Sequence, residues 1–187
     1  MMSRVFETRL QTADLSELRL SGRVLDIGAG GEGVISRVVG DTIVAIDKRK
    51  DELEETADIG LKIVMDACDL QFLDHSFDHV TCFYALMYMK MADVEKALRE
   101  AKRVLKKDGC LWIWDAEMPD ISESEYDIFV AQIEVKLRDG EHIRTGYGIS
   151  RTAPRTAEDY IAACERCDFT ICALAKYDGY FVLQANR

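Results

Sequence analysis

No apolar run in this 187-residue sequence approaches the roughly 20 residues that a membrane-spanning helix needs, and residues 1–20 contain no hydrophobic signal-peptide core. The chain also has no internal repeat, low-complexity segment or linker-like stretch. Hydrophobic residues make up 48% of it and charged residues 31%, which excludes a disordered tail. We therefore expect one soluble, cytoplasmic domain over residues 1–187 that uses no membrane partner.

An excess of positive charge is also missing. The sequence has 24 Lys and Arg residues against 34 Asp and Glu, a net charge of -10. Nucleic-acid binding depends on clustered cations that displace counterions from phosphates. The best basic cluster, which we interpret as the solvated face of an amphipathic helix, consists of Lys102, Arg103, Lys106 and Lys107. The charge balance thus argues against a nucleic-acid partner but leaves a local basic patch open.

The pattern typical of a metal or redox site is incomplete. Among six cysteines only Cys164 and Cys167 have a suitable spacing, and no second pair follows them. The three histidines show no ligand spacing. Because the pair falls within a predicted helix, we interpret it as buried thiols and expect no metal.

What the sequence does contain is an alternation of strand-like and helical patterns. Strands are expected at residues 24–27, 42–46, 61–65, 79–84 and 110–114. Helices are expected at 32–39, at 50–58, and from Val94 to a stop near Asp108 and Gly109. Such repeats demand right-handed crossovers and place helices on both faces of a parallel sheet.

After Pro119 the pattern becomes antiparallel. Apolar and polar residues alternate over 129–137 and again over 143–149, which predicts a hairpin inserted at 121–150. Thr156 and Asp159 form a capping-box pattern that opens a helix. Segments 169–176 and 180–185 predict a closing hairpin. The expected fold is α/β and doubly wound, with a mostly parallel seven-stranded sheet, a reversed final strand and the extra hairpin.

The first strand leads into a glycine loop, Gly28 to Gly33, that fits the G-x-G-x-x-G pattern. Ligands of open α/β sheets bind beyond the carboxyl ends of the strands, where glycine lets them approach the backbone. Asp47 ends the second strand, so its carboxylate can accept both hydroxyls of a ribose. These features alone suit a nicotinamide dinucleotide equally well.

Two further carboxylates separate the candidates. Asp26 precedes the loop, where its charge opposes a pyrophosphate but tolerates the ammonium group of an amino-acid-bearing cofactor. Asp66 ends the third strand and can accept a hydrogen bond from the amine of adenine. Each has a structural alternative, a brace for the loop and a helix cap respectively. Three acids at three successive strand ends favour the amino-acid-bearing cofactor.

Four stretches carry a family resemblance: VLDIGAGGEG (24–33), Asp47, MDACDLQFLDHSFDHV (65–80) and ALREAKRVLKKDGCLWIWD (97–115). With them the chain resembles class I S-adenosylmethionine-dependent methyltransferases, particularly the small-molecule (type 11) branch that includes ubiquinone/menaquinone C-methyltransferases. The resemblance implies a Rossmann-like methyltransferase fold. Met87 and Tyr88 depart from it, because relatives often carry histidine there.

The resemblance implies S-adenosylmethionine as cofactor, S-adenosylhomocysteine as product, and no metal. It implies that Gly28 and Gly30 lie against the amino-acid part, that Asp66 and Ala67 meet the adenine, and that Phe83 borders the methionine. The full set expected to bind the cofactor is Asp26, Gly28, Ala29, Gly30, Asp47, Lys48, Asp66, Ala67 and Phe83.

Methyl transfer by in-line displacement asks the protein chiefly to position the acceptor and exclude water, and a base is needed only if the acceptor loses a proton. The catalytic group is therefore left open, with Tyr88, Glu117 and His142 as candidates. Tyr84 and Asp115 also lie near strand ends, and Tyr147 lies on the hairpin. That hairpin is expected to be either a lid or, through residues 127–150, a homodimer edge.

The leading functional hypothesis is a methyltransferase acting on a small molecule. A nicotinamide oxidoreductase would leave Asp26 and the 66–78 segment unexplained. A non-catalytic S-adenosylmethionine sensor or subunit and a methyltransferase acting on RNA stay open as alternatives. The sequence does not identify the acceptor or the methylated atom.

Overall fold

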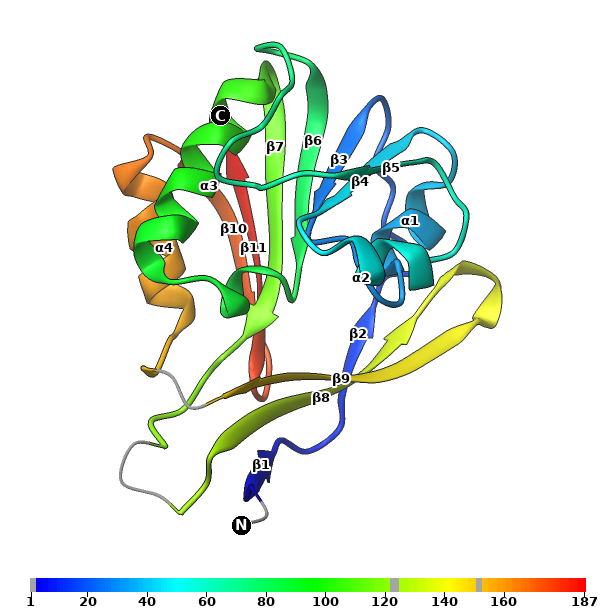
Figure 1. Ribbon diagram of the computed structural model, residues 1–187. Helices are drawn as coiled ribbons and strands as arrows, with labels where there is room; N and C mark the ends of the chain where they lie inside the picture. Colours follow the sequence, from blue (N-terminus) through cyan, green and yellow to red (C-terminus); the bar gives the residue numbers. More distant parts are fainter. Residues whose placement is uncertain (1–2, 122–124, 151–152) are drawn as a thin grey trace.

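The computed structural model describes residues 3–121, 125–150 and 153–187. Two sheets build the molecule (Figure 1). The larger has seven strands in the order β10-β11-β7-β6-β3-β4-β5. The smaller has four strands, in which β8 pairs with each of β1, β2 and β9. Within the described ranges, no helix combines the length and the apolarity needed to span a bilayer.

The parallel part of the large sheet confirms the predicted fold class. It consists of β3 (Val24–Ile27), β4 (Ile43–Asp47), β5 (Leu61–Val64), β6 (Phe77–Phe83) and β7 (Leu105–Ala116). Every residue of β3 is buried, as expected for a strand that is covered on both faces. The last hairpin is β10 (Thr170–Lys176) and β11 (Tyr180–Asn186), and β11 runs antiparallel to β7, which confirms the reversed final strand.

Helices cover the two faces of this sheet. On one face α3 (Met91–Val104) packs against α4 (Ala157–Arg166), and the buried positions of α3 recur every three or four residues. The capping box of α4 is present as predicted, and Cys164 and Cys167 are both buried. The short helices α1 (Val34–Val39) and α2 (Lys50–Glu55) follow β3 and β4. A 3-10 turn, η1 (Leu86–Tyr88), follows β6.

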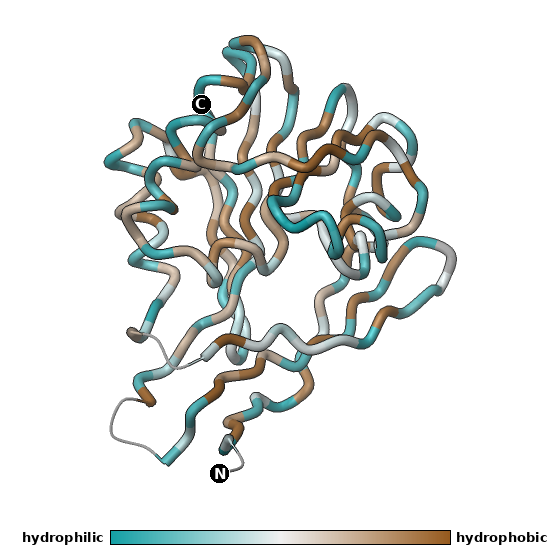
Figure 2. The backbone as a smooth tube through the Cα atoms, in the orientation of Figure 1, coloured by the Kyte–Doolittle hydropathy of each residue, from teal (hydrophilic) through white to brown (hydrophobic). Residues whose placement is uncertain are grey.

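The smaller sheet contains the predicted hairpin, β8 (Ile128–Lys136) and β9 (His142–Ser150), joined through η2 (Arg138–Gly140). Hydrophilic and hydrophobic residues alternate along this hairpin (Figure 2). Two N-terminal strands that the sequence analysis missed, β1 (Val5–Glu7) and β2 (Gln11–Asp14), pair parallel with β8. Residues 122–124 of the predicted insertion lie outside the described residues.

The predicted end of α3 was wrong. The helix stops at Val104, and β7 begins at Leu105 rather than at Cys110. Lys106 therefore lies on the strand, where its Nζ is 2.7 Å from Asp78 Oδ1 at the start of β6. Lys107 is also on β7, so the basic cluster does not form one helix face. A Cβ at Gly109 would lie 2.9 Å from the Lys106 carbonyl oxygen, so this glycine serves an irregular strand and not a helix end.

The two short helices are also shorter than predicted. Helix α1 begins at Val34 and not at Glu32, because Gly33 has a left-handed backbone with φ of 60°. Helix α2 ends at Glu55 and not at residue 58. The buried Thr56 ends it in an extended conformation, and its hydroxyl donates to the carbonyl oxygens of Glu52 (3.0 Å) and Ala29 (3.3 Å).

Candidate functional site

The glycine loop lies at the carboxyl ends of β3 and β4. The backbone N–H groups of Gly28 and Ala29 both donate to the Ile46 carbonyl oxygen, at 2.9 and 3.0 Å, which fastens the loop to β4. Gly28 has φ of +72°, and a Cβ there would lie 2.4 Å from the Ala85 Cβ. A Cβ at Gly30 would lie 2.4 Å from the Glu52 Cβ. Both positions therefore require glycine, because the loop packs closely against Ala85 and Glu52.

The first two predicted carboxylates lie beside this loop. Asp47 Oδ2 lies 3.1 Å from where a Gly30 Cβ would be, and Asp47 Oδ1 accepts a hydrogen bond from the Arg49 N–H at 2.8 Å. Asp26 is buried beneath the loop and accepts from the Thr81 hydroxyl at 2.6 Å. Burial raises the pKa of Asp26 to about 7, the Thr81 hydrogen bond lowers it, and the charge of Asp47 raises it further. A cationic ligand group nearby would favour the ionised form of Asp26, so this environment suits such a group.

The third predicted carboxylate, Asp66, lies two residues beyond the neighbouring strand β5, which ends at Val64 and not at residue 65 as predicted. The Met65 N–H donates to the Asp47 carbonyl oxygen at 3.0 Å, which sets the segment after β5 beside the end of β4. Asp66 is exposed, and its Oδ1 accepts from the Cys68 N–H at 2.8 Å. Ala67 is partly buried and Lys48 is exposed. The predicted cofactor residues are thus grouped around one sheet edge.

Aromatic rings border the site at the end of β6. Phe83 is buried, and the following Tyr84 is 1% exposed with an unusual φ of 50°. Tyr147 of β9 stacks on Tyr84, with ring centroids 4.7 Å apart, and meets Phe83 edge-on at 6.2 Å. The Tyr84 hydroxyl has no hydrogen-bond partner among the described residues. Burial raises the pKa of both tyrosines, so both hydroxyls stay protonated.

Glu32, inside the glycine loop, is a site residue that the sequence analysis missed. Its Oε1 accepts from the Thr145 hydroxyl, and its Oε2 accepts from the Tyr147 hydroxyl at 3.3 Å. Its carbonyl oxygen accepts from Arg37 Nε at 3.2 Å. The only signal in the sequence was an acid within a glycine motif, since the partners of its carboxylate lie more than 110 residues away.

Of the three candidates for acceptor contact, Tyr88 lies at the rim of the site. It ends η1 half exposed, with its hydroxyl by the backbone of Gly148. Burial, helped by the charges of Asp115 and Glu52, raises the pKa of Tyr88 to about 12. Asp115 itself is fully buried and accepts hydrogen bonds from the N–H groups of Met87 (3.0 Å) and Ala116 (2.8 Å). Burial raises the pKa of Asp115 to about 7, although these hydrogen bonds lower it.

The structure does not bring the other two candidates to the glycine loop. Glu117 turns towards α4, where its Oε1 accepts from the Ala157 N–H at 3.3 Å and lies 3.4 Å from Lys176 Nζ. His142 is exposed at the start of β9, with its Nδ1 3.7 Å from Glu134 Oε2. It precedes Tyr147 by five residues, which is about 17 Å along a strand.

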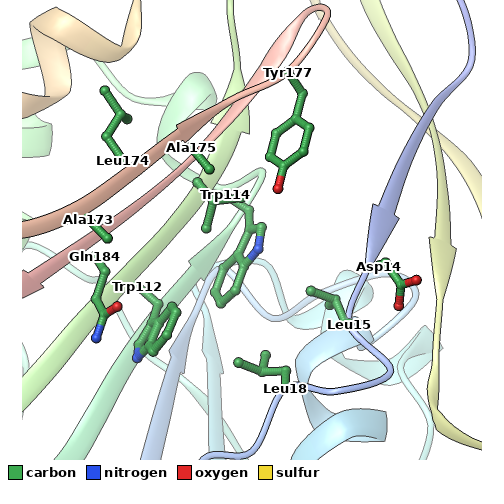
Figure 3. Close-up of a pocket in the computed structure, with 11 residues that line it drawn as sticks. Asp14, Leu15, Leu18, Trp112, Trp114, Ala173, Leu174, Ala175, Tyr177 and Gln184 are labelled. Carbon is green, nitrogen blue, oxygen red and sulfur yellow. The ribbon is translucent and has the colours of Figure 1, made fainter.

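A separate groove of about 330 Å³ lies over β7, β10 and β11 (Figure 3). Trp112 and Trp114, the only two tryptophans of the sequence, form part of its lining, together with Leu15 and Leu18 of the segment after β2. None of the residues predicted to bind the cofactor or the acceptor lines this groove.

Comparison with known proteins assigns the central part of the chain. Residues 25–113 match the family model described as a methyltransferase domain. An uncharacterized methyltransferase of Bacillus subtilis strain 168, YcgJ, is 35% identical over 140 residues, which are 69% of this chain and 53% of that protein. The ubiquinone/menaquinone biosynthesis C-methyltransferase UbiE of Enterobacter sp. strain 638 is 34% identical over 155 residues, which are 71% of this chain and 61% of that protein. The chain spans about half to three fifths of the length of these relatives.

Solved structures confirm the fold. An S-adenosylmethionine-dependent methyltransferase from Mesorhizobium loti superposes with a TM-score of 0.62 at 15% identity, covering 88% of this chain and 90% of the other. The PH0226 protein from Pyrococcus horikoshii OT3 gives a TM-score of 0.64 at 17% identity, covering 92% and 84%. The matched domain and the curated relatives show that this chain belongs to the S-adenosylmethionine-dependent methyltransferase family, and the solved structures share its fold.

Proposed function

We propose that this protein transfers a methyl group from S-adenosylmethionine to a small-molecule acceptor by in-line displacement. The observation that carries the proposal is the glycine loop with the Asp47 carboxylate beside Gly30, at the carboxyl edge of a methyltransferase domain. This loop follows β3 and packs tightly on Ala85 and Glu52 through Gly28 and Gly30, and ligands of open α/β sheets bind at this end of the strands. The Asp47 carboxylate beside it fits a ligand that offers hydroxyl groups.

The proposed cofactor contacts follow the strand ends. Asp47 accepts the ribose hydroxyls, Asp66 and Ala67 meet the adenine, and Gly28 and Gly30 hold the amino-acid part. Asp26 supplies negative potential for the ammonium group. Burial, and to a smaller extent the charge of Asp47, raises its pKa, and a cation beside it would favour the ionised form. Ala29 and Lys48 complete the binding edge. When bound, the cofactor supplies an electrophilic methyl on a positively charged sulfur.

The chain's own part in the reaction is to orient the acceptor and keep water out. Phe83, Tyr84 and Tyr147 form an apolar wall for that purpose. Tyr88 is the candidate that orients the acceptor, as a hydrogen-bond donor and not as a base, because its raised pKa keeps the phenol protonated. Glu117 and His142 lie away from the glycine loop, with partners on α4 and β8 respectively.

A small-molecule acceptor fits better than RNA. Three of the four residues of the basic cluster have partners within the chain. Arg103 pairs with Glu100 and Asp74, Lys106 pairs with Asp78, and Lys102 donates to the Asp168 carbonyl oxygen. The net charge of -10 also disfavours binding to a negatively charged phosphate backbone.

The second candidate is cofactor binding without transfer. The positions of Glu117 and His142 away from the glycine loop favour it, because neither of these two candidates then lies where it could act as a base. The fold alone does not decide between the two, since the [4+2]-cyclase SpnF has it as well, with a TM-score of 0.63 at 18% identity.

A turnover assay separates the candidates. The protein is incubated with S-adenosylmethionine carrying an isotopically labelled methyl group and a fractionated metabolite extract, and in parallel with total RNA. We expect S-adenosylhomocysteine and a labelled small molecule from the extract, both absent with Asp47→Ala. Label in RNA would shift the acceptor class. Tight cofactor binding without product from any fraction would favour the non-catalytic candidate.

A further inference from the structure

Strand β9 contacts the glycine loop directly. We infer that Thr145, Tyr147 and Glu32 form a latch through which the inserted sheet positions the glycine loop, so that this sheet is a fixed wall of the methyl-transfer site. Tyr147 and Thr145 are then positioning residues that act through Glu32. The inference rests on the proposed function for the identity of the ligand, but its contacts stand in the free protein.

The hydrogen bonds of the latch act on a segment that needs restraint. Glu32 stands between Gly31 and Gly33, which have φ of +69° and +60°, and glycine is the residue that loses most backbone freedom on folding. Each oxygen of its carboxylate accepts one hydrogen bond from a hydroxyl of β9: Oε1 from Thr145 and Oε2 from Tyr147. Hydrogen bonds to an ionised carboxylate are about twice as strong as neutral ones. The latch thus fixes the middle of an otherwise pliable loop.

The ring of Tyr147 fixes the acceptor side at the same time. It covers Tyr84 at a centroid distance of 4.7 Å, with an angle of 16° between the planes. Tyr84 holds a left-handed backbone that bulky residues seldom adopt, so its surroundings must stabilise it. One side chain therefore links the end of β6 to the glycine loop, the two segments between which a methyl group would pass.

The packing of the inserted sheet is that of a fixed wall and not of a lid. The inward side chains of β8, which include Ala131, Ile133 and Val135, are fully buried in the same core cluster as Val34 and Ile35 of α1. A second tie joins the hairpin to α1, with Arg37 2.9 Å from Glu141. Opening the hairpin would expose this core, whereas a lid opens at small cost in free energy.

The test uses Tyr147→Phe, Glu32→Gln and the double variant, with Glu141→Gln as the matched control. Glu141→Gln also removes a contact between hairpin and α1, an exposed one, but it leaves the two hydrogen bonds to the Glu32 carboxylate and the Arg37 hydrogen bond to the Glu32 carbonyl oxygen in place. Calorimetry measures the affinity for S-adenosylhomocysteine, and hydrogen exchange measures the loop amides of residues 28–33 in the free protein.

We expect each single variant to weaken binding about fivefold, the equivalent of one hydrogen bond, and to speed exchange of the loop amides. The double variant should be no weaker than Glu32→Gln alone, because Glu32→Gln already removes the carboxylate to which the Tyr147 hydroxyl donates. Glu141→Gln should bind as the unchanged protein does. A merely structural role would lower the melting temperature and leave both readouts alone.

Unchanged exchange in the single variants would overturn the latch, as would fivefold losses that multiply in the double variant. A wild-type protein that fails to bind S-adenosylhomocysteine would contradict the proposed function instead. In that case the exchange of the loop amides, which needs no ligand, still decides whether the latch exists.

Discussion

Gly28 and Gly40 both have a positive φ, of +72° and +82°, but differ in what surrounds them. A Cβ at Gly28 would meet Ala85 at 2.4 Å, whereas a Cβ at Gly40 would meet nothing within 4 Å. We expect Gly40→Ala to lower the free energy of unfolding by about 1 kcal/mol from backbone strain alone.

For Gly28→Ala the clash adds to the strain, so we expect a loss of about 3 kcal/mol together with loss of cofactor binding. Urea unfolding of both variants checks the difference. Equal losses would show that the close approach of Ala85 to the loop does not constrain it.

Asp26 should make stability depend on pH. Its pKa is about 7 in the folded protein against 3.8 for the free group, so folding favours its protonated form. The stabilisation is fully present below about pH 4 and is lost as pH rises through 7. Relative to the wild type, Asp26→Asn should therefore gain stability between these values, by at most about 1.4 kcal/mol per pH unit.

Urea unfolding of the wild type and Asp26→Asn, at about pH 4.5, 6 and 8, gives this difference. Acids with lowered pKa, such as Asp78 and Glu100, act in the opposite sense but cancel between the two proteins. A difference that stays constant with pH would mean that Asp26 is ionised throughout.

Among individual residues, the sequence predicts those whose positions depend on neighbours close in the chain. Gly28, Gly30 and Asp47 follow from short motifs, because a strand, a tight turn and a strand end fix their positions within a few residues. Glu32 and Tyr147 do not, since they are 115 residues apart and no periodicity connects them. His142 and Tyr147 looked alike in the sequence, and only the position of the hairpin tip separates them.

Among the elements, β8 ties the smaller sheet to the rest of the molecule. Ile133 faces inward with 0% exposure, whereas Val130 faces outward and is partly buried. Ile133→Ala should cost about 2 to 5 kcal/mol of unfolding free energy, and Val130→Ala about 1 kcal/mol or less. Chemical denaturation followed by two probes checks this. A small loss at Ile133, or an early separate transition for the hairpin, would indicate a loosely attached sheet.

Long, regular elements were predictable and short, non-local ones were not. The alternation in β8 and the three- to four-residue period of α3 show their buried faces directly. Strands β1 and β2, three and four residues long, owe their existence to pairing with β8, as in Val5 with Ile128. The end of α3 was misplaced because an Asp-Gly pair served a strand irregularity and not a helix stop.

At the scale of the whole molecule, the two sheets meet where the parallel strands end. The large sheet brings the glycine loop and the acids of β3 and β4, and the small sheet brings Thr145 and Tyr147. Neither sheet makes the site alone. In the proposed function, Asp26 faces the ammonium group and Asp47 the ribose of the cofactor, and the acid beside a cationic group distinguishes this arrangement from a dinucleotide site.

Calorimetric titration with S-adenosylhomocysteine, and separately with NADH, tests that property most directly. We expect the wild-type protein to bind S-adenosylhomocysteine at one site per chain, Asp47→Ala to bind it at least about tenfold more weakly, and NADH to give no heat. Binding of NADH in place of S-adenosylhomocysteine, or an Asp47→Ala variant that binds as the wild type does, would contradict the account.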